Sequence, residues 1–297
     1  MSHMTNKIWI AFAATALVAL HGSPARAAAP GITGGTATAT QVTFNLDAQP
    51  GTINQPDGAQ VYSWGYGCSV QPTAFVPAAI KAPDGGCPLM QIPGPTLVVT
   101  EGQTVVVILT NNLPTSAGNT SILFPGFQLT SATGGVTGLL TQEAAPGGTV
   151  TYTFVASSPG TRSYYSGTQS DLQVEMGLYG AIIVLPKNVP AACTGGSTNG
   201  PSLGFAGKNG TAEAAWKEKD FRLAASAYDH PKTCYDREYL FQFSEMDVNI
   251  HRNAYAQVTA KTGCAAGAAG CTLEVPTEPY HPGYFLRSEE RRVGKEC

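Results

Sequence analysis

Charged residues are scarce, because only 12% of the 297 residues are Asp, Glu, Lys or Arg. The sequence has no Cys-x-x-Cys pair, no phosphate-binding glycine loop of the P-loop type and no His-Glu-x-x-His motif. These absences argue against the common cysteine-based zinc sites, P-loop nucleotide binding and zincin-type proteolysis. The sequence also has no basic stripe, which argues against nucleic-acid binding. Gly (34 residues) and Pro (21 residues) are abundant, which favours short strands joined by turns.

No apolar run is long enough to cross a bilayer comfortably, since about 20 residues are needed. The longest, Ile8 to Leu20, follows Lys7 and precedes the small residues of Ser23 to Ala27. This order is typical of a secretory signal peptide. We expect residues 1–27 to be removed, with cleavage after Ala29 as the alternative. The mature chain is then periplasmic or secreted and carries no membrane segment; a retained anchor is the other interpretation.

The last eleven residues, 287–297, differ from the rest because seven of them are charged. They resemble the translation of a sequencing-library adapter, and a natural charged tail is the alternative. We therefore expect the natural reading frame to be interrupted near Leu286. Without both ends the chain has 11 Lys and Arg against 17 Asp and Glu, a net charge of −6.

Six cysteines remain once Cys297 is set aside with the tail. An even number of cysteines behind a signal peptide predicts disulfides. Six cysteines allow 15 pairings, and nearest-neighbour pairing is the simplest hypothesis. The predicted pairs are Cys68–Cys87, Cys193–Cys234 and Cys264–Cys271.

Strand-like patterns fill residues 42–186. Alternation of apolar and polar residues is clearest in 149–154, and the run 103–110 is apolar on both faces, which predicts a central strand. We interpret residues 51–95 as a long loop because they are rich in Pro and Gly. Gly/Pro turns between short strands indicate an all-β sandwich.

The remainder of the chain is less regular. Residues 187–235 are interpreted as a linker with one short helix over Glu213 to Lys219. A second unit over residues 236–286 begins with a strand at 238–244 and continues as a loop over 255–271. Because about 50 residues bury little core, we expect this unit to be truncated.

Four stretches carry a family resemblance: Gly94 to Pro114, Thr120 to Gly126, Thr141 to Phe154 and Pro159 to Gly180. Together they resemble the first cupredoxin domain of multicopper oxidases. The resemblance implies a cupredoxin-like Greek-key β-sandwich, followed by a truncated second cupredoxin-like domain. It also implies a copper-dependent oxidoreductase that uses copper as cofactor and oxidises a small reducing substrate or a metal ion.

The copper ligands are where this sequence departs from the family. The family usually has Ser-Ile-His-Trp-His-Gly in the second stretch, where this chain has Leu123 and Pro125 at the histidine positions. In the fourth stretch it usually has Tyr-His-Ser-His, where this chain has Tyr165 and Gly167. Leu, Pro and Gly side chains have no donor atom, and a phenol of pKa about 10 is a poor ligand. We expect no metal ligands and no catalytic residues here, and no cofactor in this chain.

Other candidate ligands are few. His230, His251 and His281 are interpreted as surface or loop residues, and Met176 as a core residue. Tyr164 and Tyr165 are interpreted as packing residues. The sequence thus indicates a non-catalytic N-terminal fragment of a multicopper-oxidase-like protein. The alternative is a non-catalytic cupredoxin-fold module for envelope structure or protein binding.

Overall fold

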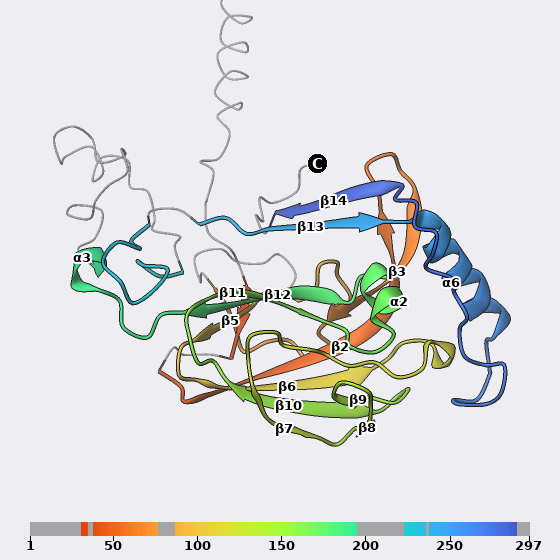
Figure 1. Cartoon of the computed structure of the whole chain (residues 1–297), viewed down its shortest axis with the longest axis horizontal. Helices are drawn as coiled ribbons and strands as arrows, with labels where there is room; N and C mark the ends of the chain where they lie inside the picture. Colours follow the sequence, from red (N-terminus) through yellow and green to blue (C-terminus); the bar gives the residue numbers. More distant parts are fainter. Residues whose placement is uncertain (1–30, 35–37, 77–86, 195–222, 236–237, 290–297) are drawn as a thin grey trace, which may run out of the picture.

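The computed structural model describes residues 31–34, 38–76, 87–194, 223–235 and 238–289. The predicted signal peptide and the predicted helix at 213–219 lie outside these ranges. Two five-stranded mixed sheets form a sandwich (Figure 1). The first has the order β11 (Gly160–Tyr165), β12 (Tyr179–Leu185), β5 (Leu97–Thr100), β1 (Gly31–Thr33) and β4 (Ala74–Val76). The second has the order β3 (Gln60–Gly67), β2 (Gln41–Asn54), β6 (Thr104–Asn111), β10 (Thr149–Val155) and β7 (Leu129–Thr133).

Strand β6 is central in its sheet, as its sequence predicts. It pairs in parallel with β2 and antiparallel with β10, where Val107 lies opposite Tyr152. In β10 the alternate residues Val150, Tyr152 and Phe154 are buried. They meet residues of the other sheet, such as Leu97 and Ile182, in one core. The all-β prediction is confirmed.

Residues 51–95 were predicted to be a loop, and this is wrong for residues 51–54, 60–67 and 74–76. Strand β2 continues to Asn54, and β3 and β4 follow. The glycines of β3 permit a close backbone approach: a Cβ at Gly65 would lie 2.4 Å from the Gln91 carbonyl oxygen, and one at Gly67 would lie 2.0 Å from that of Leu89. Glycine in a strand can mark such a close approach of two backbones. The glycines of β3 were misinterpreted as a sign of a loop.

Short elements connect the strands. They are η1 (Thr115–Ala117), β8 (Val136–Thr137), β9 (Gln142–Glu143), α2 (Ser170–Glu175) and α3 (Ala191–Thr194). Helix α2 joins β11 to β12 and packs at one end of the sandwich (Figure 1). Three disulfides join Cys68 to Cys87, Cys193 to Cys234 and Cys264 to Cys271, which are the nearest-neighbour pairs.

In the C-terminal segment β13 (Phe241–Met246) pairs antiparallel with β14 (Tyr284–Glu289), and helix α6 (Val248–Ala260) lies between them in the sequence. Helix α6 corrects the predicted loop over residues 255–260, whereas residues 261–271 contain no helix or strand. Its N-cap is Asp247, whose side chain accepts a hydrogen bond from the backbone N–H of Asn249 at 2.9 Å; this capping signal was missed. Ile250 and Ala254 of the helix belong to the same apolar core as the sandwich. Strand β14 extends three residues into the predicted adapter-derived tail.

Among the described residues, helices are too short or too polar to span a membrane.

Candidate functional site

Three of the four positions that correspond to family histidines, Leu123, Tyr165 and Gly167, lie close together. Leu123 and Tyr165 form an isolated antiparallel bridge. The Leu123 amide donates to the Tyr165 carbonyl at 2.8 Å, and the Tyr165 amide donates to the Leu123 carbonyl at 3.3 Å. Two residues paired in this way have neighbouring side chains on one face. The two stretches that carry copper-binding histidines in the family are therefore brought together in this chain.

Gly167 lies beneath Leu123. A Cβ atom at Gly167 would lie 2.7 Å from Leu123 Cγ and 2.9 Å from its Cδ1. Separations under about 3 Å are too short for carbon atoms, whose optimal contact is about 3.5–4.0 Å. The leucine side chain therefore fills the space that a larger residue at 167 would need. Pro125, the fourth position, is exposed.

These residues do not fit copper. Three of the four positions have no donor atom, and imidazole is a typical copper ligand. Within the described ranges, no cluster of three or more His, Cys, Asp or Glu side chains is placed to hold a metal ion. We derive no reaction step through copper at this position.

A polar network lies directly behind the bridge. The Gln173 side-chain oxygen accepts hydrogen bonds from Thr120 Oγ1 at 2.8 Å and from Ser166 Oγ at 2.6 Å, and its amide nitrogen donates to the Asn119 carbonyl at 2.8 Å. Gln173, Thr120 and Ser166 are fully buried. Because all three bonds use one amide orientation, they fix helix α2 against the loop that carries Leu123.

The network contains one carboxylate, that of Glu143, which is 9% exposed. One of its oxygens accepts from Thr168 Oγ1 at 2.8 Å and the other from Asn119 Nδ2 at 3.0 Å. Thr168 Oγ1 also contacts Ser121 Oγ at 2.8 Å. Both carboxylate oxygens therefore have neutral hydrogen-bonding partners, which satisfy a partly buried charge.

Aromatic side chains pack on the other side of Phe124. Its ring centroid lies 4.8 Å from that of Phe154, 5.8 Å from Tyr152 and 6.3 Å from Tyr164. The Tyr164 hydroxyl is buried and donates to the Pro95 carbonyl at 2.6 Å. Burial raises the pKa of the Tyr152 hydroxyl, so it stays protonated. These tyrosines are core residues, as predicted for Tyr164; Tyr165 is half-buried.

The three histidines lie in different surroundings. His230 is exposed, and its Nδ1 accepts from the Lys232 amide at 3.1 Å. His281 is exposed on the loop before β14. His251, which was also interpreted as a loop or surface residue, is fully buried on α6. That interpretation is wrong because the helix itself was not foreseen. Met176 is fully buried, as predicted.

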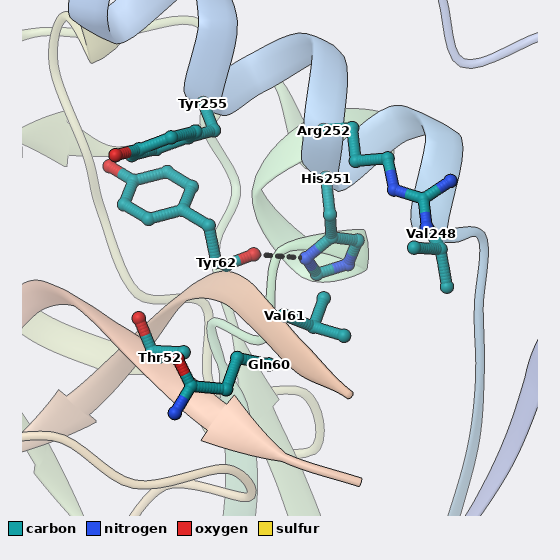
Figure 2. Close-up of a pocket in the computed structure, with 8 residues that line it drawn as sticks. All are labelled: Thr52, Gln60, Val61, Tyr62, Val248, His251, Arg252 and Tyr255. Atoms are coloured by element: carbon teal, nitrogen blue, oxygen red, sulfur yellow. Dashed lines mark hydrogen bonds between the residues drawn. The ribbon is translucent and has the colours of Figure 1, made fainter. Parts of the chain in front are cut away.

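A pocket of about 260 Å³ opens between β2, β3 and α6 (Figure 2). The Tyr62 and Tyr255 rings form one wall, with centroids 5.1 Å apart. His251 lies beside them, and Arg252 points away on the far side. This pocket was not predicted, because its lining residues lie in strand segments and a helix that were not foreseen.

Comparisons with known proteins find similarity to multicopper oxidases. Residues 90–189 match the family model for multicopper oxidases. The chain is 38% identical over 107 residues to multicopper oxidase MCE of Talaromyces pinophilus, which covers 35% of this chain and 17% of that protein. It is 39% identical over 93 residues to copper resistance protein A of Escherichia coli, which covers 31% of this chain and 14% of that protein.

A solved multicopper oxidase from Campylobacter jejuni, described as a metallo-oxidase, matches with a TM-score of 0.40 and 18% identity. The match covers 56% of this chain and 31% of that one. The aligned region is thus only a small part of each curated relative.

Proposed function

We propose that the chain is the N-terminal part of an exported multicopper-oxidase-like protein. The premise is that the sandwich is a cupredoxin domain of the multicopper oxidase family. In this protein, the domain binds no copper. The domain then acts as a scaffold for its neighbours and not as a catalytic unit. The intact protein would oxidise a small reducing substrate or a metal ion only through copper held elsewhere.

One observation carries this proposal. Three of the four positions that correspond to family histidines lie close together, yet Leu123 covers Gly167 and no imidazole is present at any of them. The network behind them, from Gln173 to Glu143, is satisfied without a metal ion. A copper ion placed there would have to displace an apolar side chain and would gain no nitrogen ligand.

A protein-binding module is the second candidate. The antiparallel pair β13–β14 exposes aromatic side chains, with Phe243 75% and Phe285 74% accessible. Exposed apolar side chains in one place favour a partner surface. The natural downstream sequence separates the two functions: a His-Cys-His stretch with a further His and Met supports a copper protein, and its absence supports the binding module.

Restoring two imidazoles tests the site. The double variant Leu123→His/Tyr165→His places two histidines on one bridged pair, so we expect it to retain about one copper ion per chain after loading and dialysis. The single variants are the matched controls, because each supplies only one imidazole, and we expect them to retain none. A folded double variant with no more copper than the single variants would contradict this account of the site.

A further inference from the structure

His251 joins three elements that are far apart in the sequence. Its ring lies on α6 and is fully buried. Nδ1 is 2.6 Å from the Tyr62 carbonyl oxygen on β3, a contact drawn in Figure 2. Nε2 is 3.1 Å from the Glu175 carbonyl oxygen at the end of α2. One side chain therefore holds the C-terminal helix against the sandwich at two points.

Both partners of the ring are carbonyl oxygens, which only accept hydrogen bonds. A neutral imidazole has one N–H donor and one lone pair, whereas the imidazolium has two N–H donors. Both contacts can thus be made together only by the protonated ring. Ser63 Oγ, 3.3 Å from Nδ1, is compatible with this state because its own hydrogen is directed to the Val61 carbonyl.

A carboxylate compensates the buried charge. Glu175 Oε1 lies 3.6 Å from His251 Nε2. It also accepts from the Asp247 amide at 2.6 Å, and Glu175 Oε2 accepts from the Tyr280 hydroxyl at 2.8 Å. The other titratable groups around the site are Tyr62, Asp247, Arg252, Tyr255, Tyr280 and His281. Among all these groups Glu175 and Asp247 are acidic and Arg252 is basic.

We propose that His251 is a buried imidazolium clamp that fixes α6 to β3 and α2, and that loss of its proton loosens α6. The neutral ring would place a lone pair against one carbonyl and lose that hydrogen bond. The clamp therefore requires a proton on both ring nitrogens. Helix α2, one of its anchors, also carries Gln173, so the clamp is connected to the network behind Leu123.

The protonation state can be measured directly on the full chain. Nitrogen NMR of labelled histidine at pH 5.5 is expected to show two protonated ring nitrogens for His251. Titration to higher pH is expected to remove one of these protons and, in parallel, to reduce the hydrogen-exchange protection of α6. A ring with one bare nitrogen at pH 5.5, or a deprotonation that leaves α6 protection unchanged, overturns the proposal.

Variants provide the second measurement. At pH 5.5, His251→Gln is expected to reduce α6 protection roughly 10- to 100-fold, the size expected for lost hydrogen bonds to a charged group. It should also abolish the pH dependence of that protection. His230→Gln, at an exposed position, is the matched control and should leave both unchanged. If His251→Gln behaves like this control, the clamp does not exist; if it does not fold, the nitrogen NMR of the unaltered chain decides.

Discussion

Replacing Gly177 by alanine is expected to destabilise the fold by about 4 kcal/mol, a large part of the 5–15 kcal/mol that stabilises a typical domain. The residue has φ = +117°, a conformation that costs an L-residue about 1–3 kcal/mol. Its new Cβ would also lie 2.4 Å from the Trp64 carbonyl oxygen and 2.2 Å from Ile92 Cδ1. Because a backbone atom cannot turn aside, β3 would have to move.

Gly147→Ala is the matched control. Gly147 also has a positive φ, +72°, but nothing lies within 4 Å of its added Cβ. Only the backbone term remains, so we expect a loss of about 1 kcal/mol. Chemical denaturation of both variants measures the difference. Equal losses would show that the close approach at Trp64 is unimportant, and that Gly177 is needed for the turn alone.

Replacing Gln173 by leucine is expected to cost about 3 kcal/mol. The change removes the partner of two buried hydroxyls, those of Thr120 and Ser166, and of the Asn119 carbonyl. A buried polar group left unsatisfied costs about 1–3 kcal/mol, and part of this cost is recovered when hydroxyls rotate to other acceptors. Urea denaturation gives the free energy of unfolding.

Gln128→Leu serves as the comparison, because Gln128 is exposed on the loop before β7. Its stability should change by less than about 0.5 kcal/mol, as is usual for surface substitutions. If Gln173→Leu were as mild, the network would not hold α2 in place. The conclusion that the Gln173 network supports the region around Leu123 would then be wrong.

The sandwich could be predicted from the sequence where burial imposes a period of two. Residues 149–154 alternate because one face of β10 is in the core, and the apolar run at 103–110 fits a strand between two neighbours. The hairpin containing β3 was missed because Gly65 and Gly67 meet carbonyl groups 26 and 22 residues away in the sequence. No local pattern reveals such a contact.

The same distinction applies to the site. The residues at the former histidine positions could be identified by motif, and the structure brings Leu123 and Tyr165 together. The packing of Leu123 on Gly167 and the role of Gln173 depend on how α2 folds back, which sequence spacing does not encode. His251 was misjudged because its two partners lie 189 and 76 residues away.

Copper retention by the unaltered chain tests the central claim most directly. The purified protein is loaded with excess copper, dialysed and measured by elemental analysis. We predict much less than one copper ion per chain, because Leu123, Pro125 and Gly167 offer no donor atom and Tyr165 only a phenol. One tightly held equivalent, lost in a variant at Tyr165, would contradict the account.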